Sequence, residues 1–476
     1  MEYEAVIGLE VHCELKTKSK MFSAAPVSFG EPYNTQTNAI DLGFTGTMPC
    51  LNKKGVEFAI RVCHALHMTI DEVLWFDRKN YYYSDLPKGF QITQDRRPIG
   101  RDGYIDIEVD GKTKRIEIER LHMEEDTAKQ VHYSNFTLLD YNRAGIPLIE
   151  IVTRPTLRSG KEAAAYLEKL RSIFLYTEVS DAKLEEGSMR CDVNISLREK
   201  GTTAFGTKTE IKNLNSISNV QKALDFEFHR QAEILENGGK VMQETRRFNE
   251  ATKETVLMRV KGDAVDYKYY TEPNILPIRL DHQWIEDIKN SLPEFADERE
   301  KRYIQTYALP EADAKQLVAT KTLSDYYETA LKTSQEYKLI ANWLLVEVPA
   351  YLSKHGETFE SMKMQPDQLA KMVTLVSQGT ISGKQAKKVF EEMMNTGKDP
   401  DVIVEEKGMK QLSDSAAIKA MIEDVLTANP GLVDDYRNGK SRAVGFIVGQ
   451  VMKASKGQAN PALTNQLVVE VLKAKM

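Results

Sequence analysis

Apolar and polar residues alternate along several segments of the first 290 residues, and this pattern predicts β-strands. Between residues 6 and 15 the odd positions are apolar, whereas Glu10, His12 and Glu14 occupy even positions. Side chains alternate between the faces of a strand, so Glu10 and His12 should share one side at a separation of about 6–7 Å. That spacing suits two ligands of one metal ion. A solvent-facing strand edge explains this segment equally well.

A second alternating segment, residues 115–120, leads into His122, Glu124, Glu125 and Asp126. Alternation places Glu124 on the same face as His122 and places Glu125 on the opposite, apolar face. Clustered carboxylates supply the oxygen ligands that divalent cations such as Mg²⁺ prefer. A solvated acidic loop accounts for this segment slightly better when it is considered alone.

The third acidic position is Glu150, which lies between Ile149 and Ile151 in the apolar segment 147–152. A glutamate in such a strand is seldom buried unless it is paired or holds a cation. We favour the cation, with a buried salt bridge as the alternative.

Basic and aromatic residues accompany these acids. Arg78 and Lys79 precede three tyrosines at positions 81–83, and Lys88 follows in a Pro-Lys-Gly turn. The basic side chains could hold phosphates. The tyrosines could stack on a base, although such runs more often pack in a core. Arg190 lies on a polar strand face that could either bind substrate or form cross-strand pairs.

Local signals predict several other elements. Ser159 and Glu162 form a capping box that opens a helix ending near Tyr176. A second helix should span residues 217–237, and Asp110-Gly111 is a typical hairpin turn.

Helical periodicity dominates after Pro293, with amphipathic helices expected at 294–307, 325–331 and 337–352 and a break at 397–408. We therefore predict an α+β protein with domains 1–292, 293–407 and 408–476.

The tail domain is basic from residue 440 onward. This charge fits contact with an RNA backbone, or it is a chance surface excess. From residue 440 to 476 the only acidic residue is Glu470, and the basic residues are Lys440, Arg442, Lys453, Lys456, Lys473 and Lys475.

Composition narrows the class of protein. The chain has 476 residues, too many for one core, and 28% of them are charged. Four scattered cysteines favour free thiols in a reducing cytoplasm, and no apolar run reaches the roughly 20 residues of a membrane helix. The net charge of −6 means that any nucleic-acid binding must come from a local patch. The N-terminus lacks a signal-peptide pattern.

Common catalytic motifs are absent from the sequence. It has no Walker-type loop and no Gly-x-Gly-x-x-Gly after a strand, and amide hydrolysis has no visible nucleophile. Three acid-bearing strands with basic neighbours fit a site for a nucleotide and its metal ion.

Six motifs spread over the whole chain resemble the GatB family, the B subunits of the bacterial tRNA-dependent amidotransferase GatCAB. The motifs are Val6–His12, Arg78–Tyr81, Leu121–Asp126, Pro147–Val152, Glu186–Asn194 and Ser455–Pro461. Two positions depart from the family pattern: Ser84 replaces an expected proline, and Phe90 an expected tyrosine. The cysteine zinc knuckle of some relatives is also missing.

The resemblance implies a cradle-shaped kinase domain, distantly like glutamine synthetase, followed by a helical domain and a tRNA-binding tail. It implies that ATP phosphorylates the side-chain carboxylate of Glu-tRNA(Gln) or Asp-tRNA(Asn). Ammonia from the glutaminase, which is the GatA chain, then displaces phosphate, and the small GatC chain completes a cytoplasmic heterotrimer. The alternative is a tRNA-binding scaffold whose catalysis lies in its partners.

The same resemblance implies roles for individual residues. Those expected to hold Mg²⁺ are Glu10, His12, Glu124, Glu125 and Glu150, of which Glu10, Glu125 and Glu150 would be catalytic. Those expected near the nucleotide or substrate are Arg78, Lys79, Tyr81, Lys88 and Arg190.

Overall fold

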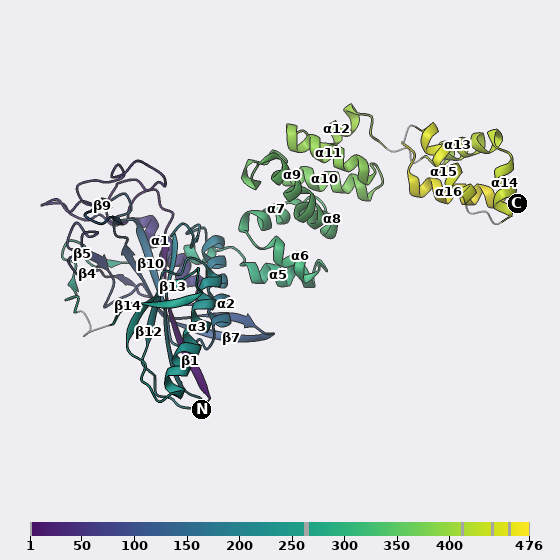
Figure 1. Ribbon diagram of the computed structural model, residues 1–476. Helices are drawn as coiled ribbons and strands as arrows, with labels where there is room; N and C mark the ends of the chain where they lie inside the picture. Colours follow the sequence, from purple (N-terminus) through teal and green to yellow (C-terminus); the bar gives the residue numbers. More distant parts are fainter. Residues whose placement is uncertain (1, 261–265, 411–413, 439–441, 456–457, 476) are drawn as a thin grey trace. The chain divides into compact units, whose positions relative to one another are not determined.

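The computed structural model describes residues 2–260, 266–410, 414–438, 442–455 and 458–475. It divides into two compact units, Met1–Phe295 and Ala296–Met476. Strands occur in the first unit, and the described elements of the second are helices (Figure 1). A large sheet followed by a helical region agrees with the predicted α+β class. In the described parts of the chain, no helix combines the length and apolar character needed to cross a membrane.

A nine-stranded sheet organises the first unit, with strand order β14-β13-β12-β11-β1-β10-β7-β6-β2. Neighbouring strands are antiparallel except for the parallel pair β12 and β13. The strands are β1 (Tyr3–Glu14), β2 (Thr69–Ile70), β6 (Gly100–Val109), β7 (Lys112–Glu125), β10 (Pro147–Thr153), β11 (Met189–Glu199), β12 (Thr209–Lys212), β13 (Glu244–Asn249) and β14 (Glu254–Val260).

Smaller sheets complete the unit. One joins β15 (Tyr270–Thr271), β4 (Asp77–Asn80) and β5 (Phe90–Thr93). The others are the pairs β3 (Val73–Leu74) with β16 (Ile278–Arg279) and β8 (Lys129–His132) with β9 (Thr137–Asp140).

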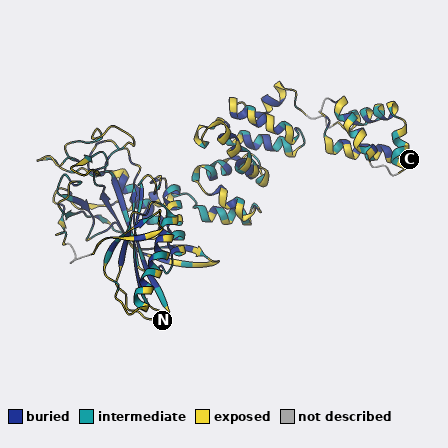
Figure 2. Cartoon of the chain, in the orientation of Figure 1, coloured by how far each residue is buried: buried dark blue, intermediate teal, exposed yellow. Residues whose placement is uncertain are grey.

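One face of the large sheet is apolar and forms the core with the helices that cover it. The helices that contact the sheet are α1 (Lys53–Ala65), α2 (Gly160–Tyr176) and α3 (Ile217–Glu236), and α4 (His282–Asn290) packs against α1. Figure 2 shows the buried residues concentrated along the central strands. The odd-numbered residues of β1 belong to this core, as the alternation predicts. The even-numbered residues therefore point to the opposite face, where the candidate site lies.

Short sequence motifs correctly predicted two helices and one hairpin turn of this unit. The Ser159 side chain accepts a hydrogen bond from the Glu162 amide at 3.2 Å and begins α2 as predicted. The Glu162 carboxylate accepts its hydrogen bond from the Arg158 amide, so the second half of the predicted capping box does not form. The predicted second helix is α3. Asp110 and Gly111 both have positive φ angles, 51° and 73°, and connect β6 to β7 as a tight hairpin.

The second unit is helical and contains two separate hydrophobic clusters. Its elements are α5 (Ala296–Gln305), α6 (Glu311–Leu317), α7 (Lys321–Leu331), α8 (Tyr337–Asn342), the π-helix Trp343–Glu347, α9 (Val348–His355), the 3₁₀ turn Phe359–Ser361, α10 (Pro366–Ser377), α11 (Gly383–Thr396), α12 (Pro400–Glu406), α13 (Ser415–Ala428), α14 (Gly431–Arg437), α15 (Arg442–Ala454) and α16 (Pro461–Ala474).

Two predictions for this unit need correction. The expected helix 337–352 contains a π-helical turn just before Pro349, whose missing N–H cannot complete the α-helical hydrogen-bond pattern. The expected break at 397–408 is wrong because it contains α12. Gly397, with a φ of 72°, ends α11, and the Asp399 side chain accepts a hydrogen bond from the Asp401 amide to begin α12.

Candidate active site

The polar face of the large sheet, opposite its apolar core face, carries a row of ionisable residues across four strands. His12 of β1 lies opposite Glu150 of β10 on one side and Arg190 of β11 on the other. Glu150 in turn lies opposite His122 of β7. The antiparallel register therefore brings together residues that are far apart in the sequence.

Three of the predicted metal ligands converge on this face. His12 Nε2 lies 3.3 Å from Glu150 Oε2 and 3.7 Å from Glu124 Oε1. One ligand atom from each of the three residues lies within 4.8 Å of the others. Two ligands of Mg²⁺ at right angles are about 3 Å apart when each is 2.0–2.1 Å from the ion. The three side chains thus need only small adjustments to hold one divalent cation.

His122 supports the same carboxylates. Its Nε2 lies 3.1 Å from Glu150 Oε2 and 3.7 Å from Glu124 Oε2. Its Nδ1 accepts a hydrogen bond from Arg120 Nε at 3.3 Å, which leaves the Nε2 proton for Glu150. Sequence reasoning placed His122 on the correct face but did not propose it as a site residue. Its signal was the shared strand face with Glu124.

The carboxylates of Glu124 and Glu150 favour positively charged groups beside them. Burial favours the neutral form of Glu150, but His122 and His12 outweigh it and hold the Glu150 pKa well below its usual range. Burial also opposes protonation of His12, yet the hydrogen bond and charge of Glu150, together with Glu124, raise the His12 pKa to about 9. A pair of carboxylates that attracts protons to nearby histidines is also suited to a cation.

Glu10 lies one step along β1, on the same face. Asn194 Nδ2 donates a hydrogen bond to Glu10 Oε1 at 3.0 Å. Burial raises the pKa of Glu10, and the negative charges of Glu150 and Asp192 raise it further. Glu10, Glu124 and Glu150 line the same groove, whose volume is about 300 Å³. This crowding of acids would be relieved by a cation in the groove.

Glu125 has different neighbours from Glu124, as strand alternation requires. It is buried, it forms an ion pair with Lys88, and its Oε1 accepts a hydrogen bond from the Ile92 amide at 3.0 Å. It does not belong to the converging group of His12, Glu124 and Glu150. Its carboxylate is instead neutralised by Lys88.

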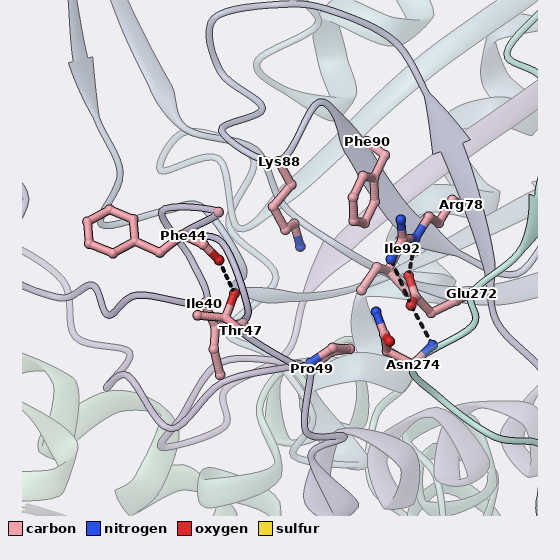
Figure 3. A pocket seen from close by; sticks show the side chains of 11 residues that line it. Ile40, Phe44, Thr47, Pro49, Arg78, Lys88, Phe90, Ile92, Glu272 and Asn274 are labelled. Carbon is pink, nitrogen blue, oxygen red and sulfur yellow. Dashed lines mark hydrogen bonds and ion pairs between the residues drawn. The ribbon is translucent and has the colours of Figure 1, made fainter.

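Arg78 and Lys88 line a separate cavity of about 160 Å³, shown in Figure 3. The Arg78 guanidinium donates two hydrogen bonds to Glu272, at 2.6 and 3.1 Å, and lies 3.9 Å from the centroid of the Phe90 ring. Both basic residues therefore have carboxylate partners, Glu272 for Arg78 and Glu125 for Lys88 (Figure 3 shows the Arg78 pair).

Lys79 faces the acidic groove that Glu10 and Glu150 line. Its Nζ lies 4.8 Å from the ring centroid of Tyr267 and 5.8 Å from that of Tyr81. Tyr81 is half-buried, but its two neighbours, residues 82 and 83, are 94% and 56% exposed. The core interpretation is wrong for these two tyrosines.

Arg190 is held by acids at the end of the polar face. Its Nη2 lies 2.8 Å from Asp126 Oδ2, and Arg143 Nε lies 3.4 Å from the same oxygen. Burial is the main cause that raises the pKa of nearby Glu14 to about 8, and the negative charge of Asp126 adds to it. Sequence reasoning noted Asp126 and Glu14 without assigning them a role, because their pairing depends on the sheet register.

The basic tail is partly described. Arg442 and Lys453 are exposed on α15, whereas Lys475 pairs with Glu423 at 2.5 Å and Glu470 with Lys419 at 2.9 Å. Lys473 is exposed on α16. Lys440 and Lys456 lie outside the described residues.

Comparison with known proteins identifies relatives over the full length. A family model described as the GatB/GatE catalytic domain matches residues 5–286, and a GatB domain model matches residues 325–472. The chain is 54% identical over 471 residues to the B subunit of aspartyl/glutamyl-tRNA(Asn/Gln) amidotransferase from Geobacillus kaustophilus, which covers 99% of both chains. The protein of that name from Bacillus pumilus is 52% identical over 476 residues, 100% of both chains. These matches cover both units, and the chain belongs to the GatB family of aspartyl/glutamyl-tRNA(Asn/Gln) amidotransferase B subunits.

Proposed function

We propose that the protein is the B subunit of a tRNA-dependent amidotransferase. In this proposal it uses ATP to phosphorylate the side-chain carboxylate of Glu-tRNA(Gln) or Asp-tRNA(Asn), and ammonia then displaces phosphate to give Gln-tRNA(Gln) or Asn-tRNA(Asn). The observation that carries the proposal is the convergence of His12, Glu124 and Glu150 within the stretch that matches the family's catalytic domain.

The chemistry explains why such a site is needed. A carboxylate does not accept ammonia until one of its oxygens becomes part of a phosphate leaving group. When bound, Mg²⁺ would offset the charge of the phosphates as they approach the substrate carboxylate. The residues that would hold it are His12, Glu124 and Glu150, and Glu10 lies on the same groove as a further oxygen ligand. Glu125 would join them only after its carboxylate separates from Lys88.

The basic residues near the site fall into two sets: one lines the acidic groove, and the other is paired with carboxylates. Lys79 faces the acidic groove and would bind the transferred phosphate or the substrate carboxylate. Tyr81 lies beside Lys79. Arg78, Lys88 and Arg190 are each paired with a carboxylate and would orient the walls of the site.

The remaining parts of the proposal concern partners. The sequence has no motif for the hydrolysis of glutamine, so we assign release of ammonia to a glutaminase partner, GatA, with the small GatC chain completing a heterotrimer. We also propose a function for each domain. The sheet-containing domain, residues 1–292, would be a cradle-like kinase domain, and a helical domain, residues 293–407, follows it. The tail domain, residues 408–476, would contact tRNA. A protein with aminoacylated tRNA as its substrate would act in the cytoplasm.

Replacing one ligand tests the proposal. Glu150→Gln keeps the size of the side chain but removes the charge that both histidines contact. We expect the rate of ATP-dependent amidation by the purified heterotrimer to fall at least about 100-fold, with tRNA binding unchanged. Glu108→Gln, on an exposed position of β6, is the matched control. Normal amidation by Glu150→Gln would contradict the proposal and favour a scaffold role.

A further inference from the structure

Lys79 lines the acidic groove without a carboxylate partner of its own. In the part of the chain that the structure describes, its ammonium group forms no ion pair and donates no hydrogen bond. The arginine of the groove, Arg120, donates instead to His122 and to the backbone carbonyls of Gln94 and Asp95. Since an ammonium group carries three N–H donors, Lys79 has unused donors beside the groove.

Two tyrosine rings hold the Lys79 ammonium in place of a carboxylate. Lys79 Nζ lies 4.8 Å from the ring centroid of Tyr267 and 5.8 Å from that of Tyr81. Both distances fall within the roughly 6 Å over which a cation is attracted to the face of an aromatic ring. The stronger contact is therefore the one with Tyr267.

The Tyr267 ring is fixed by other rings on two sides. Its centroid lies 5.9 Å from that of Tyr81, and the two rings meet edge to face at 68°. It lies 6.1 Å from the ring of Tyr269, also edge to face, at 70°. Tyr269 in turn lines the acidic groove. This packing restricts the orientation of the ring that Lys79 contacts.

The backbone around Tyr267 is attached to β4, the strand that carries Lys79. The Asn80 amide donates to the Tyr267 carbonyl at 2.9 Å, and Asn80 Nδ2 donates to the Lys268 carbonyl at 2.8 Å. Lys268 has a φ of 45°, in the left-handed region that residues with a side chain seldom adopt. Such conformations persist where neighbouring contacts impose them, and they cluster at functional sites.

A ring contact has a different effect on a lysine than an ion pair has. Glu125 neutralises Lys88, and Glu272 neutralises Arg78. A tyrosine ring has no net charge and attracts the ammonium through the negative face of its quadrupole. Lys79 therefore keeps its full charge, and the N–H groups that point away from the rings remain for a ligand.

We infer that Tyr267 is a positioning residue, whose ring holds the Lys79 ammonium at the acidic groove so that its charge is available to an anionic oxygen of the substrate. This inference rests on the proposed function, in which Lys79 binds the transferred phosphate or the substrate carboxylate. It adds the group that sets the position of Lys79.

The test varies the charge distribution of the ring while its shape is kept. Tyr267→Phe removes the hydroxyl and keeps the negative face. A trifluorinated phenylalanine analogue at position 267 keeps the shape but withdraws electron density from the face, and Tyr267→Leu removes the ring. We would measure kcat for amidation and the Tm of each purified heterotrimer.

Tyr104→Leu is the matched control. Its ring lies 3.7 Å from Arg115 Cζ, so the substitution also removes a contact between a tyrosine ring and a cation. Tyr104 lies on β6 and does not line the acidic groove. Its kcat should therefore equal that of the wild type.

We expect Tyr267→Phe to keep kcat within about twofold of the wild type, because the ring face is retained. The fluorinated analogue and Tyr267→Leu should lower kcat about 3- to 30-fold, the rate equivalent of one cation–π contact. The fluorinated protein should unfold at the same Tm as Tyr267→Phe. The inference would be overturned if the analogue had the same kcat as Tyr267→Phe, if Tyr267→Phe lost as much activity as Tyr267→Leu, or if Tyr104→Leu lost as much as Tyr267→Leu.

The proposed function is judged separately, by whether amidation by the wild-type heterotrimer requires ATP and is lost in Glu150→Gln. ATP-dependent amidation that does not respond to fluorination of the ring would overturn the inference alone and leave the proposed function standing. Amidation by the wild type without ATP would overturn both.

Discussion

His12 and Glu150 lie opposite each other on β1 and β10, and 3.3 Å separates His12 Nε2 from Glu150 Oε2. This pair forms the centre of the polar sheet face, because His122 approaches the same Glu150 oxygen from the other side. Two histidines that share one carboxylate oxygen hold it in a fixed position. Strands β1, β7 and β10 of one sheet therefore position the candidate metal ligands His12, Glu124 and Glu150.

His122 should orient Glu150 for metal binding. His122→Gln removes an imidazole that lies 3.1 Å from Glu150 and 3.7 Å from Glu124. Loss of a residue that orients metal ligands typically lowers metal affinity by about 10- to 100-fold. We expect a loss of this size in Mn²⁺ affinity, measured by electron paramagnetic resonance. His132→Gln, in the exposed strand β8, is the control, and an equal effect of both substitutions would contradict the assignment.

Lys88 should stabilise the fold as the partner of a buried acid. The side chains of Lys88 and Glu125 are only 13% and 6% exposed. Lys88→Met leaves Glu125 buried without its counter-charge, which should lower the free energy of unfolding by about 3 kcal/mol. Urea denaturation of the variant measures the change. The double variant Lys88→Met/Glu125→Gln should recover part of the loss, and an unaltered urea midpoint in Lys88→Met would show that the pair does not stabilise the fold.

Divalent cations should raise thermal stability through the converging acids. Binding to the native state alone stabilises a protein by about 2.7 kcal/mol when the ligand concentration is 100 times its Kd. We therefore expect Mg²⁺ to raise the Tm of the wild-type protein in differential scanning calorimetry. Glu124→Gln should remove most of this increase, whereas the exposed control Glu108→Gln should retain it. Equal increases in both variants would argue for ion binding elsewhere.

The tail should contribute charge to tRNA binding. Arg442 and Lys453 are exposed and both lie on α15. Replacing both with glutamate should weaken tRNA binding and reduce the slope of log affinity against log salt by about 1 per lost phosphate contact. Filter binding at several salt concentrations gives the slope. Lys112→Glu, at the exposed start of β7, serves as control, and an unchanged slope in the double variant would remove the tail from the binding surface.

The individual elements of the site could be predicted from the sequence because alternation is local. It assigned Glu10 and His12 to one face of β1 and separated Glu124 from Glu125 on β7, and the structure has both. The predictions that failed, such as the break that contains α12, depend on weak local signals in a helical region.

The pairing of strands and its register could not be predicted from local alternation. The pairing of β1 with β10 joins residues 138 positions apart (150 minus 12), and a shift of one residue would have turned Glu150 away from His12. The partners of Arg78 and Lys88 also come from distant segments. Only the folded sheet shows which acids meet each other and which meet a basic residue.

The position of a bound metal ion would show whether His12, Glu124 and Glu150 hold a divalent cation. Anomalous scattering from crystals soaked with Mn²⁺ and a non-hydrolysable ATP analogue would locate the ion. If these acids and His12 hold the ion, one peak will lie about 2.2 Å from His12 Nε2 and from one carboxylate oxygen each of Glu124 and Glu150. A fully occupied peak elsewhere, with these three side chains free of the ion, would contradict this assignment.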